Sequence, residues 1–208
     1  FPSFKKMESL FVMIEELKTN YHPPFLYHNF YHIYNKAVGS DLLFYTDENY
    51  KYFLKKFSFF MNNFINTYAF CLLPNHFHFL ISPIVNDPEI ISRQFKRLFI
   101  SYSMALNKQR GRRGNLFQKN FKRKVVCGEN HLKKVVHYIH VNPLHHSVFI
   151  DFKNYAYSSY KIIIGTGFTN LKRTDVINWF SGIKEFIDCH KKNKIDIWKE
   201  LLALEEKI

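Results

Sequence analysis

Two histidines separated by one phenylalanine, His76-Phe77-His78, are the residues of this sequence best suited to bind a metal ion. The apolar residues around them predict a β-strand, in which residues two apart point to the same face. We expect His76 and His78 to project together from a sheet face left open for chemistry, where two imidazoles can bind one metal ion. The alternative is a pair of surface histidines in a chain that has 11 histidines.

A tyrosine and an asparagine four residues apart form the second candidate site. Tyr138 and Asn142 share one face of a predicted helix, one turn apart, so the phenol and the carboxamide can point at the same object. A tyrosine can act as a covalent nucleophile, but its ordinary pKa of about 10 requires help from a metal or a base. The alternative is a packing tyrosine and a helix-terminal asparagine. The buried stripe of this helix is predicted to be Leu132, Val135, Val136 and Ile139.

A basic run lies between these two motifs. Residues 108–124 contain eight Lys and Arg and no acid, and Phe117 and Phe121 lie among them. Such a segment suits a phosphate backbone, and aromatic rings can stack on unpaired bases. The alternative is a solvated loop beside two core phenylalanines; we expect the loop to contact nucleic acid and at least one Phe to pack in the core. The predicted nucleic-acid-binding residues are Lys108, Arg110, Arg112, Arg113, Lys119, Lys122, Arg123 and Lys124.

The elements that must position these residues follow the order strand, helix, strand, strand, helix, strand. This order predicts an α+β, ferredoxin-like (split βαβ) antiparallel sheet with its two helices on one face. The tyrosine helix follows the last strand, starts at Asn130 and ends near Asn142, because Pro143 disfavours helical geometry in the residue before it. Additional helices are expected at both ends of the chain. The predicted ranges are 30–38, 46–66, 68–73, 76–82, 88–108 and 116–126 for the core, and 4–20, 175–190 and 195–207 for the extra helices.

Composition narrows the class of protein. The 208 residues are 47% hydrophobic, enough for a sizeable core, and the net charge of +13 favours a polyanionic partner, either nucleic acid or an acidic membrane surface. No apolar run is long enough to span a bilayer, no signal peptide is visible, and no helix has the strong basic and apolar faces of a membrane-surface helix. The three cysteines are far apart and lack metal spacing, which favours a reducing cytoplasm.

Taken together and in this order, the motifs resemble the single-strand DNA transposases of the HUH class with one catalytic tyrosine, above all the REP-associated tyrosine transposases. The resemblance covers residues 28–165. It rests on six segments: Tyr31-His32-Ile33-Tyr34-Asn35, Phe44 with Asp47-Glu48, Leu73 to Ile81, Arg112 to Gln118 with Phe121-Lys122, Tyr138 to Pro143, and Ser158-Ser159-Tyr160.

The resemblance implies a mechanism. His76 and His78 would bind a divalent metal, Mg²⁺ or Mn²⁺, with Asn142 as a third ligand, and the metal would polarise the scissile phosphate. Tyr138 would attack the phosphorus and form a 5′-phosphotyrosine link, releasing a free 3′-OH. The expected partner is single-stranded DNA carrying a hairpin, the expected state a monomer or homodimer without membrane contact, and the expected location the nucleoid of a bacterial cytoplasm.

Two other functions remain open at this point: a non-catalytic or domesticated nucleic-acid-binding protein on the same fold, and an RNA-binding ferredoxin-like protein. The first would give binding without a covalent adduct, and the second would prefer RNA. The resemblance also suggests a division of the chain into an N-terminal helical extension (1–27), a catalytic domain (28–165) and a C-terminal helical extension (166–208).

Overall fold

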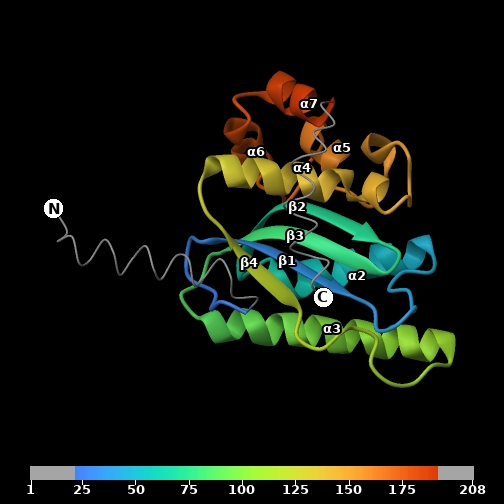
Figure 1. Cartoon of the computed structure of the whole chain (residues 1–208). Coiled ribbons are helices and arrows are strands. Elements are labelled where there is room, and N and C mark those ends of the chain that lie inside the picture. Colours follow the sequence, from blue (N-terminus) through green and yellow to red (C-terminus); the bar gives the residue numbers. More distant parts are fainter. Residues whose placement is uncertain (1–21, 192–208) are drawn as a thin grey trace.

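The computed structural model describes residues 22–191, and their centre is a four-stranded antiparallel sheet with the strand order β2-β3-β1-β4. Helices α2 and α3 lie between the strands in the chain order β1-α2-β2-β3-α3-β4 and share one hydrophobic core with one face of the sheet (Figure 1). This is the predicted ferredoxin-like α+β arrangement. The strands are β1 (Phe30–Lys36), β2 (Ile65–Leu73), β3 (His76–Pro83) and β4 (Lys122–Val126).

Helices α2 (Asp47–Met61) and α3 (Pro88–Arg110) begin at strong capping signals. The Asn49 side chain accepts hydrogen bonds from the backbone of Tyr45 and Thr46, at the start of α2. Asp87 accepts from the backbone N–H groups of Glu89 and Ile90, both at 3.0 Å, and so satisfies donors that a helix start leaves unpaired.

Helix α4 (Glu129–His145) covers the opposite face of the sheet, which corrects the expectation of an open histidine face (Figure 1). The predicted stripe of Leu132, Val135, Val136 and Ile139 is buried against β2, β3 and β4. Because an apolar stripe of this size gains free energy when it leaves water, α4 packs on the sheet and closes over His78.

The C-terminal elements share a second core with α4 and with the face of the sheet that α4 covers. They are the short 3₁₀ helix η1 (Phe152–Asn154) and the helices α5 (Tyr160–Ile164), α6 (Arg173–Trp179) and α7 (Ile183–Lys191). The single helix predicted at 175–190 is wrong. Ser181 and Gly182 have positive φ angles of 64° and 133°, a backbone shape that ends one helix before the next starts.

Other predicted boundaries also need correction. Helix α2 stops at Met61 rather than near residue 66, because residue 65 already pairs in β2. Strand β4 starts at Lys122 rather than at residue 116, since Asn120 has a left-handed φ of 58° that interrupts the strand; before it, only Ala37 and Phe117 form an isolated bridge.

Helix α4 differs from its prediction at both ends. It starts at Glu129, with Gly128 rather than Asn130 at the N-cap. It also continues past Pro143 to His145. The proline costs the helix one hydrogen-bond donor, and the packing of the next residue, Leu144, on the second core offsets this loss.

The predicted helices at 4–20 and 195–207 lie outside the described residues, and the division at residues 27 and 165 stays a prediction. Residues Val176, Phe180 and Phe186 share a core with α4, so the C-terminal helices pack against this helix. None of the three cysteines, all of which lie within residues 22–191, forms a disulfide. Between residues 22 and 191, no helix has the length and apolar character needed to cross a membrane.

Candidate active site

The two motif histidines meet the tyrosine helix between β3 and α4. His76 and His78 lie on the sheet face that α4 covers, with ring centroids 5.2 Å apart. The Tyr138 ring lies 5.6 Å from the His78 ring at a near-perpendicular angle of 83°, and the Asn142 Oδ1 atom lies 3.2 Å from His76 Nε2. The structure therefore brings together all four residues that the sequence analysis selected for catalysis and metal binding.

Strand pairing fixes where the histidines lie. In the antiparallel register of β1 and β3, Lys36 faces His76 and Tyr34 faces His78. The turn before His76 is anchored, because Ala37 donates its N–H to the Asn75 carbonyl at 2.8 Å, and Leu43 and Phe44 donate to the carbonyl of Pro74. Residues Phe77 and Phe79 point to the opposite face and enter the main core, so the alternation predicted for this strand is confirmed.

We call the group formed by His76, His78, Tyr138 and Asn142 the tyrosine–histidine cluster. Three further residues lie against it and were not selected from the sequence: His32, Tyr34 and His146. The Nε2 atom of His32 lies 3.0 Å from Nδ1 of His78, and the Tyr34 ring lies 5.1 Å from the His32 ring. The His146 ring lies 4.4 Å from the His76 ring. His32 and Tyr34 alternate on β1 with the core residues Tyr31 and Ile33, which is the sequence signal that could have placed them on the α4 face.

Each motif histidine has a partner at its Nδ1 nitrogen. His76 Nδ1 lies 2.6 Å from the Asn75 side-chain oxygen, and His78 Nδ1 lies 3.0 Å from His32. Histidines that bind metals are commonly held this way, because a partner at one nitrogen fixes the tautomer and the orientation of the ring. The second nitrogen, Nε2, contacts Asn142 in His76 and is buried in His78.

Burial keeps these imidazoles neutral. Desolvation lowers the pKa of His32 to about 3, helped by the nearby Lys124 charge, and lowers the pKa of His76 to about 3, helped by His146. The pKa of His78 falls well below its ordinary value for the same main reason. Neutral imidazole is the form that binds a metal ion.

The residues predicted to hold a metal would offer two imidazoles and one amide oxygen. Within residues 22–191, no three His, Cys, Asp or Glu side chains lie close enough together to hold a metal ion. Asn142 is fully buried, its Oδ1 contacts His76, and its Nδ2 has no hydrogen-bond partner in the described part of the chain. Imidazole suits transition-metal ions, whereas Mg²⁺ prefers oxygen ligands, so either ion would need water and phosphate oxygens to complete its ligand shell.

The sheet divides the predicted nucleic-acid-binding residues between its two faces. Residues that pair directly across antiparallel strands share a face, and Lys122 and Lys124 pair with Tyr34 and His32. These two lysines therefore border the tyrosine–histidine cluster. Arg123 points to the other face, where its guanidinium lies 4.4 Å from the centre of the Phe25 ring and donates to Ser92.

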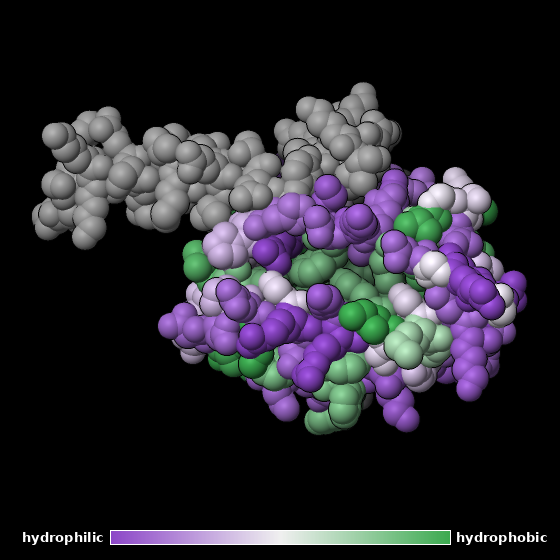
Figure 2. Space-filling view, turned by 90° about the horizontal axis from the view of Figure 1, so that it is seen from below, coloured by the Kyte–Doolittle hydropathy of each residue, from purple (hydrophilic) through white to green (hydrophobic). Residues whose placement is uncertain are grey.

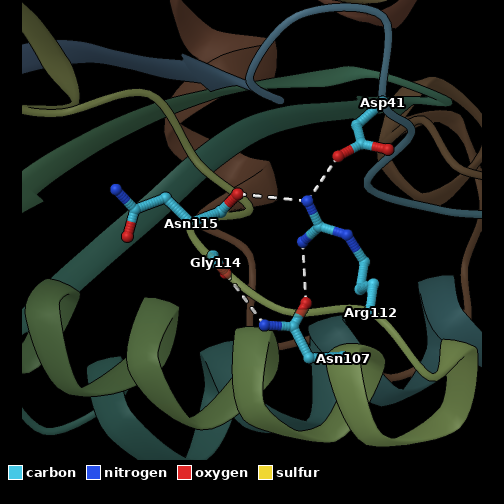
Figure 3. A network of polar contacts seen from close by, with 5 residues as sticks. All are labelled: Asp41, Asn107, Arg112, Gly114 and Asn115. Atoms are coloured by element: carbon cyan, nitrogen blue, oxygen red, sulfur yellow. Dashed lines mark hydrogen bonds and ion pairs between the residues drawn. The ribbon is translucent and has the colours of Figure 1, made fainter.

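Arg112 is occupied within the protein. It pairs with Asp41, donates at 2.7 Å to the Asn107 side chain and at 3.1 Å to the Asn115 carbonyl, and so ties the loop after α3 to the β1–α2 connection (Figure 3). Arg110 lies over the Tyr45 ring at 4.3 Å. The exposed members of the predicted set are Lys108, Arg110, Arg113 and Lys119.

These positions can now be compared with known proteins. No protein-family model matches the chain, and no curated protein matches it in sequence. Among solved structures, the chain shares its fold with a REP-associated tyrosine transposase. That structure shows the transposase bound to a REP hairpin; the match has a TM-score of 0.60 and 14% identity, and covers 70% of this chain and 85% of the other.

Proposed function

We propose that this protein cleaves and rejoins single-stranded DNA through a covalent bond between Tyr138 and a 5′-phosphate. The observation that carries the proposal is the meeting of Tyr138 and Asn142, from α4, with His76 and His78, from β3. These side chains come from segments more than 50 residues apart, and they supply a nucleophile beside a candidate metal-ligand set. The shared fold with a tyrosine transposase supports the same reading.

The reaction needs a phenol near an electrophilic phosphorus. The Tyr138 oxygen would form a bond to phosphorus while the bond from phosphorus to the 3′ oxygen breaks. The phenol proton is lost and the 3′ oxygen gains one, so the products are a 5′-phosphotyrosine and a 3′-OH. Attack by another 3′-OH reverses the step and joins strands.

His76, His78 and the Asn142 amide oxygen would hold a divalent ion. When bound, such an ion supplies positive charge that polarises the phosphate and stabilises the leaving oxygen. The protein adds two fixed charges beside the cluster, Lys122 and Lys124, which attract the DNA backbone to this face.

Access to the nucleophile requires a rearrangement. The Tyr138 side chain is 1% exposed, so a phosphate cannot reach its oxygen while α4 lies as it does here. Binding of DNA must therefore shift α4 or the loops beside it. Catalytic contacts that tighten only in the substrate complex are common in enzymes.

A second candidate function follows from the same burial. A protein in which Tyr138 stays covered would bind nucleic acid through its basic surface without cutting it, as a domesticated relative of a transposase. The two functions differ in one measurable property, which is formation of a covalent protein–DNA adduct.

The test is an adduct assay on the full chain. Labelled single-stranded DNA pools, with and without hairpins, are incubated with the protein and Mn²⁺ or Mg²⁺ and analysed on denaturing gels. We expect a metal-dependent, protease-sensitive adduct that Tyr138→Phe and His76→Ala abolish. Tyr160→Phe is the matched control, because it removes one hydroxyl from another buried tyrosine of the same core and leaves the cluster intact.

Absence of an adduct with both metals, in a protein that binds the same DNA, overturns the catalytic proposal and favours the binding protein. RNA binding in preference to DNA overturns both.

A further inference from the structure

A surface cavity of about 610 Å³ lies between α3 and the segment that leads into β4, away from the tyrosine–histidine cluster. This volume falls in the range of sites that bind small molecules or parts of larger ones. Its apolar lining includes three phenylalanines, Phe99, Phe117 and Phe121. The cavity therefore offers aromatic surface inside a basic region.

The aromatic part of the lining is rigid. The Phe99 ring lies 4.7 Å from the Phe117 ring and 5.6 Å from the Phe121 ring, and all three pack on the main core. Phe117 is 8% exposed, so its ring is held by the surrounding core and forms a fixed part of the cavity lining. Fixed aromatic and apolar surface of this kind suits a flat ring, such as a nucleobase.

Polar groups complete the lining. The side chain of Asn35 is held by two backbone contacts, because its Nδ2 donates to the Gln118 carbonyl at 3.3 Å and its Oδ1 accepts from the Lys36 N–H at 2.8 Å. Gln118 contributes a second side-chain amide to the lining. An amide carries both a donor and an acceptor, as hydrogen bonding to the edge of a base requires.

The charge around the cavity is strongly positive. Residues 88–126 contain eleven Lys and Arg and one acid. One of these cations, Lys96, lines the cavity, whereas its neighbour Arg97 is exposed and does not line it. Figure 2 views the molecule from the α3 side and shows hydrophilic residues over most of this face, with apolar surface between them. The phosphate of a nucleotide bound in the cavity would therefore lie near the positive charge of Lys96.

The cavity and the tyrosine–histidine cluster occupy the same end of β1. Asn35 lines the cavity, and its neighbour Tyr34 lies against the cluster on the other face of the sheet. The next residue, Lys36, pairs with His76. One strand of DNA passing around the β4 side of the sheet can therefore reach both places.

We infer that this cavity binds an unpaired nucleotide of the DNA strand whose neighbouring segment enters the tyrosine–histidine cluster. The base lies against the phenylalanines, the amides of Asn35 and Gln118 contact its edge, and Lys96 contacts its phosphate. The inference deepens the proposed function and rests on it for the identity of the polymer as DNA.

Photocrosslinking locates the base. Single-stranded oligonucleotides that carry 5-iododeoxyuridine at successive positions are irradiated with the full-length protein, and the linked peptides are identified by mass spectrometry. We expect one position to crosslink to Phe99, Phe117 or Phe121. Crosslinks at every position that map only outside the cavity overturn the inference.

Three variants test the contacts by oligonucleotide affinity. Lys96→Gln and Arg97→Gln each remove one exposed charge from α3; we expect Lys96→Gln to weaken binding several-fold more than Arg97→Gln and to abolish the mapped crosslink. Gln118→Trp fills the cavity and should reduce affinity by about ten- to a hundredfold, the loss expected for one stacked base. Equal effects of Lys96→Gln and Arg97→Gln, together with an unchanged affinity of Gln118→Trp, overturn the inference.

Competition with free dTMP distinguishes the two sources of a nucleotide. Inability of millimolar dTMP to displace the crosslink supports a nucleotide within a strand, and displacement at micromolar concentration assigns the cavity to a soluble nucleotide instead. The adduct assay is a separate readout. A crosslink in the cavity without an adduct rejects catalysis alone, and an adduct without this crosslink rejects the cavity alone.

Discussion

The two faces of one sheet are both packed against helices, but only one of them buries a histidine cluster. Toward α2 and α3 the strands present aromatic and aliphatic side chains, and the Phe79 ring stacks 4.1 Å from the Phe57 ring of α2; we call this the apolar face. Toward α4 the same strands present His32 and His78 together with apolar residues such as Leu80, and α4 adds Asn142; we call this the polar face. Both faces gain stability from apolar burial, but the polar face also keeps polar groups out of water at a cost in stability.

Specific hydrogen bonds limit the same kind of cost for the histidines buried between α4 and the C-terminal elements. His190 donates from Nδ1 to the Phe186 carbonyl, which leaves its Nε2 to accept from His140 Nδ1 at 3.0 Å. His140 Nε2 then accepts from the Ser159 hydroxyl at 2.8 Å, and Ser159 Oγ accepts from the Phe70 N–H. These histidines and Ser159 are buried together with partners, whereas the Asn142 Nδ2 atom is buried without a hydrogen-bond partner among residues 22–191.

The largest expected effect on stability comes from a substitution on the apolar face. Phe79→Ala should lower the free energy of unfolding by about 3–5 kcal/mol, because it removes a buried ring and leaves a cavity. Urea denaturation followed by circular dichroism measures the change. His78→Ala, one residue away on the other face, should cost less; an equal or larger loss would contradict the division of roles between the faces.

The second prediction concerns the polar face. His32→Asn should weaken Mn²⁺ binding by about 10- to 100-fold, since it removes the partner that holds His78 Nδ1. Isothermal titration calorimetry with Mn²⁺ alone measures the affinity. His28→Asn is the matched control, because His28 is exposed with a φ of 62° that asparagine tolerates. Unchanged affinity in His32→Asn would remove His32 from the metal site.

The third prediction concerns the pH dependence of stability that comes from the buried histidine of α7, His190. Burial lowers the pKa of His190 to about 3, below its value of about 6.5 in an unfolded chain. The folded protein therefore binds fewer protons between these values. Its stability is complete above pH 6.5 and decreases as the pH falls toward 3, by up to about 1.4 kcal/mol per pH unit for this residue.

Urea unfolding at pH 7.5 and pH 5 measures this dependence. His190→Gln should be less stable than the wild type at pH 7.5 and should lose less stability on acidification. A pH dependence identical to that of the wild type would show that His190 does not contribute to it.

The smallest expected effect distinguishes the roles of two adjacent arginines in the loop after α3. Arg112→Gln should lower stability by about 1 kcal/mol, because it breaks the half-buried contacts to Asp41 and Asn107. Arg113→Gln should leave stability unchanged but weaken DNA binding and reduce its salt dependence by one phosphate contact. Denaturation and salt-dependent fluorescence anisotropy measure the two, and a reversed pattern would contradict the assignment.

Local patterns in the sequence were sufficient for the elements with strong periodicity. The alternation of His and Phe in β3 and the apolar stripe of α4 predicted both elements and four residues of the site. His32 and Tyr34 were missed as site residues because only strand pairing places them beside His78. The covering of the histidines by α4 was missed because an amphipathic stripe does not specify the surface on which it packs.

The two edges of the sheet have a consequence for aggregation. The β2 edge is closed by backbone hydrogen bonds, in which Leu72 donates to Tyr157, Ser159 to Phe70, and Lys172 to Thr67, each at 2.9 Å. The other edge strand, β4, begins with Lys122-Arg123-Lys124. Charged edge strands discourage edge-to-edge pairing between molecules. Neutralising these three residues to study DNA binding should therefore also make the protein more prone to self-association, whether or not DNA is present.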